Sequence, residues 1–154
     1  MRRGWFAFIL VAVAAALLFS VGPTIGGGRS KQWLNLPGRG DDLPFSHAVS
    51  AGDTIYVAGT LGLDSETGKP PSDPKAEVRL VMDGIKQKLA LAGATMDDLV
   101  TVQVFCPDLS LYEDFNAVYR TYFKKGSYPA RAFVGSGPLL RGARFEVNGI
   151  AVKR

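Results

Sequence analysis

The chain has 154 residues, with 18 basic and 14 acidic side chains, one histidine and one cysteine. This length suits a single domain, one cysteine excludes an intrachain disulfide, and the two potential ligands are too few for a usual zinc site within one chain. Three basic residues, Arg2, Arg3 and Arg29, precede the domain, which is otherwise close to neutral, so its charge argues against a nucleic-acid-binding surface.

The first residues have the layout of an export signal. Two arginines precede the run from Trp5 to Val21, which is 17 residues long and uncharged, and a glycine-rich stretch follows. We expect a signal peptide or an N-terminal membrane anchor over residues 1–24, a linker over 25–42, and export of the rest to the periplasm or another extracytoplasmic space. The run is short for a membrane span, and no clean small-residue cleavage site precedes Pro23, so both fates stay open, with the anchor slightly favoured.

Residues 43–154 are expected to form the folded domain. The stretches 45–50 and 53–63 predict a β-hairpin, because the second is rich in β-branched and aromatic residues and follows the turn pair Gly52-Asp53. Asp73-Pro74 then predicts the start of a helix, with the aspartate as N-cap and the proline at the first helical position. Apolar residues at helical spacing continue this amphipathic helix as far as Ala92.

The second half of the domain alternates again between strand and helix. A capping box at Ser110 and Glu113 predicts the start of a second amphipathic helix. Strands are predicted on either side of it, over residues 99–106, 130–135 and 144–152.

The element order β-β-α-β-α-β-β predicts an α+β domain in which two helices cover one face of a mixed sheet. The other face still carries apolar side chains, for which we expect Val102 or Val104, and a partner subunit is the simplest cover for it.

Two charged residues lie inside predicted strands. Arg131 is costly to bury in an apolar strand without a partner, and its planar guanidinium suits a carboxylate. Glu146 shares one strand face with Asn148. Either Arg131 and Glu146 pair across strands or face water, or they serve a binding site. The single His47 and Cys106 are expected to be structural, since no basic neighbour activates the thiol.

Six stretches, taken in order and at their spacing, resemble the RidA (YjgF-like) family of reactive intermediate deaminases, which is also described as L-PSP endoribonucleases. They are Gly52–Gly59, Asp64–Gly68, Ala92–Ala94, Phe115–Tyr119, Tyr128–Arg131 and Glu146–Val152. The resemblance covers residues 43–152. It implies chorismate-mutase-like subunits, a homotrimer with a cleft at each subunit interface, and neither a metal nor another cofactor.

The resemblance also implies a hydrolase like 2-iminobutanoate/2-iminopropanoate deaminase. Arg131 would hold the carboxylate of a 2-imino or 2-enamino acid, and Glu146 would position a water molecule and handle its proton. Hydrolysis would release ammonia and a 2-keto acid. The alternative is a non-catalytic trimeric member of the same family that binds small carboxylates.

The remaining site residues implied by the resemblance are Phe45, Gly59, Asn116 and Phe133, which would bind the substrate. Some positions depart from the pattern of the family. Phe45 stands where a tyrosine is common, so a phenolic hydroxyl is missing, and Phe133 stands where a smaller residue is common, which narrows the expected cleft. Thr60 and Asn148 likewise replace a glutamine and a second glutamate.

Overall fold

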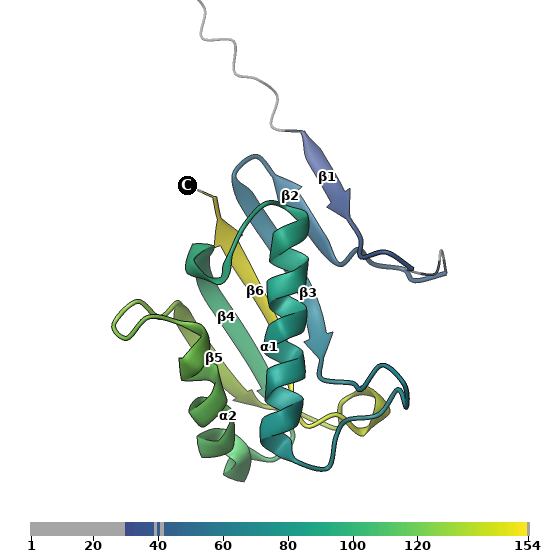
Figure 1. Cartoon of the computed structure of the whole chain (residues 1–154), viewed down its shortest axis with the longest axis vertical. Coiled ribbons are helices and arrows are strands. Elements are labelled where there is room, and N and C mark those ends of the chain that lie inside the picture. Colours follow the sequence, from purple (N-terminus) through teal and green to yellow (C-terminus); the bar gives the residue numbers. More distant parts are fainter. Residues whose placement is uncertain (1–29, 39, 41, 154) are drawn as a thin grey trace, which may run out of the picture.

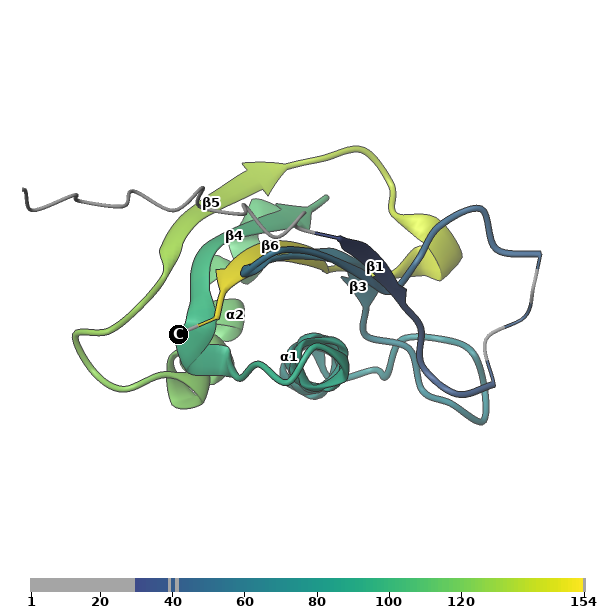
Figure 2. The ribbon, with the colours of Figure 1, turned by 90° about the horizontal axis from the view of Figure 1, so that it is seen from above.

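The computed structural model describes residues 30–38, 40 and 42–153, which form one curved sheet with helices on one face (Figures 1 and 2). The strands are β1 Lys31–Leu34, β2 Ala48–Ala51, β3 Thr54–Leu61, β4 Leu99–Cys106, β5 Ala130–Gly135 and β6 Glu146–Val152. The α-helices are α1 Pro74–Leu91 and α2 Tyr112–Tyr119. The sheet order is β1-β2-β3-β6-β4-β5, and only the β4–β5 pairing is parallel. The predicted α+β class and mixed sheet are confirmed.

The N-terminal part of the described chain adds a strand to the predicted order. Strand β1 lies in the stretch assigned to the linker, and Trp33 stands opposite Val49 of β2. The sheet therefore begins earlier than residue 43. The expected signal or anchor over residues 1–24 lies outside the described residues, and within those residues no helix is long and apolar enough to span a membrane.

Local side chains set the starts of the two helices. The Asp73 carboxylate accepts hydrogen bonds from Lys75 N at 3.0 Å and Ala76 N at 3.1 Å, which confirms the predicted cap of α1. The capping box predicted at Ser110 was wrong. Asp108 instead accepts from Ser110 N at 2.9 Å and caps a short 3₁₀ turn, so that α2 begins at Tyr112.

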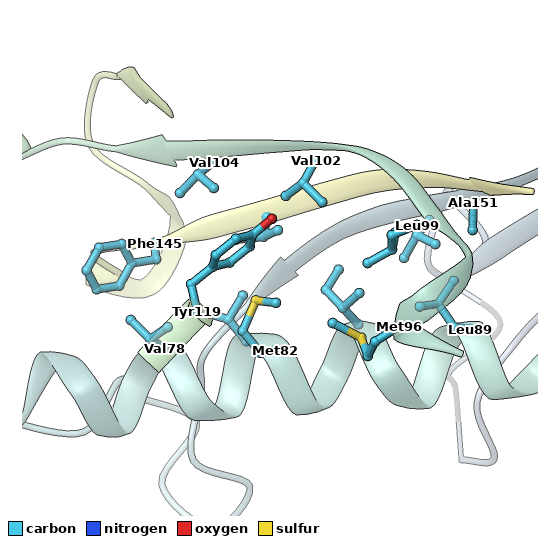
Figure 3. Packing of buried hydrophobic residues seen from close by; sticks show 14 of the residues in the cluster. Val78, Met82, Leu89, Met96, Leu99, Val102, Val104, Tyr119, Phe145 and Ala151 are labelled. Atoms are coloured by element: carbon cyan, nitrogen blue, oxygen red, sulfur yellow. The ribbon is translucent and has the colours of Figure 1, made fainter. Parts of the chain in front are cut away.

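The hydrophobic core fills the layer between the helices and the sheet (Figure 3). Val102 and Val104 point from β4 toward the helices and are almost fully buried. The expectation that they lie on the uncovered face was wrong, because the side chains of β4 alternate in the opposite phase from the one expected. Val104 stands opposite Val147 of β6, which is equally buried, so both face α1 and α2.

The face of the sheet opposite the helices is partly apolar, but through other residues than the sequence suggested. Neighbouring strands place Trp33, Val49, Tyr56 and Ile150 in one row across it. Trp33 is 68% exposed and Tyr56 is 50% exposed. Large exposed rings gathered on one face are typical of a surface that meets another protein.

A buried ion pair joins α1 to the chain that leads into β6. The Glu77 side chain is fully buried, and its Oε2 lies 2.6 Å from Arg144 Nε. Glu77 Oε1 also accepts from Arg144 N at 2.7 Å and from Phe145 N at 3.1 Å. The Arg144 guanidinium additionally donates to the carbonyl oxygens of Pro71 and Ser72. One carboxylate thus positions the residues immediately before β6.

We expect Glu77→Ala to lower the free energy of unfolding by about 3 kcal/mol, because it leaves Arg144 Nε and two main-chain N–H groups without their acceptor and the buried guanidinium without its counter-charge. Urea denaturation followed by circular dichroism measures the change. The exposed Glu113 is the control, and Glu113→Ala should change the same free energy by less than about 0.5 kcal/mol. Equal stability of the two variants would contradict the structural role of Glu77.

The exposed row on the open face predicts a homo-oligomer, which the family resemblance specifies as a trimer. Light scattering on the full-length protein should give the mass of three chains. Tyr56→Glu should shift the protein toward smaller species, because it places a charge in the expected subunit contact. Leu80→Glu, at an exposed position of α1 on the other side of the sheet, should leave the mass unchanged. A monomeric wild-type protein would contradict the prediction.

Candidate functional site

Arg131 lies at the sheet edge, on the face that the helices cover. In the parallel pairing of β4 and β5, Arg131 stands opposite Val102, whose side chain is buried between the sheet and the helices. Arg131 Nη2 donates to Asn116 Oδ1 of α2 at 2.8 Å and to the Tyr112 hydroxyl at 3.5 Å. The strand and the helix together therefore fix the guanidinium.

Aromatic rings surround the Arg131 guanidinium. Its Cζ lies 4.5 Å from the centroid of Tyr119 and within 6 Å of the centroids of three further rings, those of Tyr112, Phe115 and Phe133. The negative faces of such rings attract a cation. The Tyr119 hydroxyl is buried without a hydrogen-bond partner in the described part of the chain. Burial raises the pKa of Tyr119 to about 12, against the opposing charge of Arg131, so its hydroxyl stays neutral.

An open hollow of about 370 Å³ lies beside this arginine. It is lined by Asn116, Tyr119, Arg120, Tyr128, Pro129 and Arg131. Among the ion pairs of the described residues, none joins Arg131 to a carboxylate. A fixed guanidinium that lacks an internal anion and faces a hollow can bind the carboxylate of a small molecule.

Glu146 is the first residue of β6 and stands between Leu61 of β3 and Phe105 of β4. The next residue, Val147, is buried against the helices, so Glu146 faces the opposite side of the sheet. Its carboxylate lies against Gly59, where an added Cβ would overlap Oε1. No hydrogen bond or ion pair holds this carboxylate within residues 30–38, 40 and 42–153, so its oxygens are available to a ligand or to water.

The structure does not bring Arg131 and Glu146 together within one chain. Their strands are separated by β4, and their side chains lie on opposite faces of the sheet. The interpretation that the two charges simply pair across strands was therefore wrong. Two half-sites remain, one around the guanidinium and one around the carboxylate.

The other candidate residues divide between these half-sites. Asn116 and Phe133 contact Arg131, while Gly59 contacts Glu146. Phe45 is 48% exposed and lies in the segment before β2, with its ring edge-on to His47 at 6.3 Å.

His47 is held by hydrogen bonds, and Cys106 is buried in the core. His47 Nδ1 accepts from Leu36 N at 3.2 Å, and its carbonyl oxygen accepts from Ala58 N at 3.1 Å. Cys106 is fully buried, and burial raises the pKa of its thiol. Both observations agree with the structural roles expected of them. Within the described part of the chain, no three His, Cys, Asp or Glu side chains are grouped to hold a metal ion.

The sequence analysis did not identify Tyr119 or Lys88 as candidate site residues. The Tyr119 ring packs against the Arg131 guanidinium. Lys88 is only 5% exposed, and its Nζ donates three hydrogen bonds to the β3 segment next to Glu146. Burial lowers the pKa of Lys88 to about 8, and the charge of Glu146 opposes that shift. The signal was present in the sequence, because Lys88 follows Ile85 by three residues and so lies on the apolar stripe of the helix.

Comparison with known sequences matches this chain to relatives along most of its length. The family described as Endoribonuclease L-PSP matches residues 41–153. A RutC family protein of Sulfurisphaera tokodaii is 36% identical over 71% of this chain and 88% of that protein. Proteins named 2-iminobutanoate/2-iminopropanoate deaminase are 35% identical in Mus musculus, over 71% of this chain and 82% of that protein, and 31% identical in Escherichia coli, over 72% and 88%.

Solved structures share the fold. A putative endoribonuclease from Thermotoga maritima superimposes with a TM-score of 0.73 at 30% identity, covering 80% of this chain and 98% of that one. RidA from an Antarctic Psychrobacter species gives a TM-score of 0.71 at 31% identity, covering 79% and 98%. Escherichia coli TdcF with bound serine gives 0.73 at 25% identity, covering 80% and 99%.

Proposed function

The chain belongs to the endoribonuclease L-PSP family, which includes its RidA-type relatives, and on this premise we propose that it hydrolyses reactive 2-imino and 2-enamino acids to 2-keto acids and ammonia. The observation that carries the proposal is the fixed guanidinium of Arg131, which forms no ion pair with the described residues and lies beside an open hollow. The names of the mouse and Escherichia coli relatives specify 2-imino acids, each of which has one carboxylate for such a guanidinium.

Two groups of this chain carry the proposed reaction. Arg131 binds the substrate carboxylate through its planar fork and so fixes the imine carbon in place. Glu146 orients a water molecule, accepts one of its protons as the oxygen attacks the C=N carbon, and returns that proton to the nitrogen. Glu146 next accepts the hydroxyl proton of the resulting intermediate and passes it to the nitrogen as the C–N bond breaks, which releases ammonia and leaves the 2-keto acid. A 2-enamino acid enters the same route after protonation of its carbon to the imine.

The two groups meet between subunits in this proposal. Arg131 and Glu146 lie on opposite faces of one sheet, so one chain does not present both to one substrate. In a homotrimer, Arg131 of one subunit would face Glu146 of its neighbour across an interface cleft. The open face that carries Glu146 also carries the exposed Tyr56 and Trp33, which supports burial of this face in a subunit contact.

The alternative function is binding of a small carboxylate without turnover. It needs Arg131 but no proton transfer. Phe45 favours it, because its side chain has no hydroxyl to contact an imine nitrogen. The two functions separate at Glu146, whose carboxylate is needed for hydrolysis and not for binding.

We expect Arg131→Ala to abolish imine hydrolysis and Glu146→Gln to lower kcat by about 10²–10⁴-fold, the usual contribution of a general acid or base. An amino-acid oxidase generates the 2-imino acid in the presence of the full-length protein, and semicarbazide traps what is not hydrolysed. Two control variants remove the same kinds of charge from exposed positions. Arg79→Ala matches Arg131→Ala, Glu113→Gln matches Glu146→Gln, and both should leave the rate unchanged. Full activity in both site variants would contradict the assignment. Binding of a 2-keto acid without hydrolysis by the wild-type protein would support the alternative.

A shared interface site makes a quantitative prediction for mixed oligomers. Arg131→Ala and Glu146→Gln chains, each inactive alone, should regain activity when co-expressed in equal amounts. About a quarter of the interfaces would then combine an intact arginine from one chain with an intact glutamate from the other. Recovery near a quarter of the wild-type rate is expected, and no recovery in verified mixed oligomers would contradict a site shared between subunits.

A further inference from the structure

Lys88 is a buried cation whose hydrogen-bond partners are all neutral. Its Nζ donates to Ala58 O at 3.1 Å, Gly59 O at 2.9 Å and Thr60 Oγ1 at 2.8 Å. Among the ion pairs of the described residues, none includes Lys88. An ammonium group has three N–H donors, and here each has an acceptor, whereas a neutral amine could satisfy only two of them.

The three acceptors belong to an irregular part of β3. Between Val57 and Thr60 this strand advances three residues while β6 moves two, from Gly149 to Val147, so β3 contains a bulge. Gly84 lies one helical turn before Lys88, and a Cβ there would come within 2.7 Å of Thr60 Cγ2. Helix α1 therefore approaches the bulge closely, and Lys88 donates to two main-chain carbonyl oxygens within it.

Glu146 lies on the other side of the same bulge. Its carboxylate is packed against Gly59 so closely that no side chain fits there. The ammonium holds the bulge from the helix face and the carboxylate rests on it from the open face. The Gly59 peptide thus lies between two opposite charges that belong to α1 and β6.

We propose that Lys88 is a positioning residue, which fixes the β3 bulge beneath Glu146 and so holds the Gly59 main chain against the Glu146 carboxylate. The inference rests on the proposed catalytic role of Glu146 and assigns a further residue to the same site. Lys88 does not touch the substrate and acts through Glu146 and the Gly59 main chain.

Glu146 is the charged group that acts on the Lys88 ammonium, and its effect is attractive. Strand β3 contributes only neutral oxygens, the neighbouring positions of α1 are Gly84, Ile85 and Leu89, and β6 contributes the anion Glu146. Burial lowers the pKa of the Lys88 ammonium to about 8, and the charge of Glu146 limits that fall.

The first arm of the test measures this coupling without any reaction. Lysine labelled with carbon-13 at the ε position reports the titration of Lys88 in the full-length protein, and the signal is assigned by its loss in Lys88→Arg. The wild-type midpoint is expected near pH 8. Glu146→Gln removes the anion that favours the ammonium, so the midpoint should move to lower pH. An unchanged midpoint would overturn the proposal.

The second arm measures the kcat and KM of imine hydrolysis. Lys88→Met should lower kcat by at least about tenfold with little change in KM, because the carboxylate anchor at Arg131 is untouched. Lys88→Arg keeps a cation with N–H donors at this position and should retain a kcat close to that of the wild type. Lys86→Met removes an exposed charge from the same helix and should match the wild type throughout.

The outcomes separate this inference from the proposed function. A folded Lys88→Met protein with wild-type kcat would overturn the positioning role. If Lys88→Met does not fold, the titration arm still decides, because it needs only the wild-type protein, Lys88→Arg and Glu146→Gln. A coupled titration in a protein that hydrolyses no imino acid would refute the proposed function and leave the Lys88–Glu146 coupling supported.

Discussion

The structure depends on two buried charges carried by one helix. Glu77 and Lys88 are eleven residues apart on α1, about three turns, so both side chains leave the same face and enter the sheet. Glu77 accepts hydrogen bonds from the main chain that leads into β6, and Lys88 donates to the bulge of β3. A buried charge is tolerated only when such partners surround it, so the helix and these two strands have one relative placement. Glu146 lies where β3 and β6 meet.

Side chains alternate between the two faces of a β-sheet, and this alternation places the two charged candidate residues on opposite faces. Arg131 and its aromatic rings belong to the helix face, whereas Glu146 belongs to the open face. The folded chain alone therefore holds the proposed carboxylate anchor and the proposed acid–base group on separate faces of the sheet. A second subunit is the simplest means of bringing the two together, and the exposed rings of the open face offer the apolar surface for that contact.

Two polar groups lie in the core among apolar side chains. Tyr119 packs its ring against Arg131 while its hydroxyl finds no partner in the described residues. Lys88 occupies a position of the apolar stripe on α1 and still satisfies all three donors. Both features lie beside the charged candidate residues, which is where departures from a regular core are expected when a site rather than stability sets the sequence.

The sequence by itself determined the order of the elements after β1, the cap of α1 at Asp73, the hairpin turn at Gly52 and the two charges worth testing, because these follow from local chain chemistry and from periodicity. It did not determine which strand face meets the helices, and Val102 and Val104 were misplaced because a period of two fixes alternation but not its phase. It also did not reveal the β3 bulge, the partners of Lys88 or the separation of Arg131 from Glu146. Those depend on strand order and register, which arise from contacts between residues far apart in the chain.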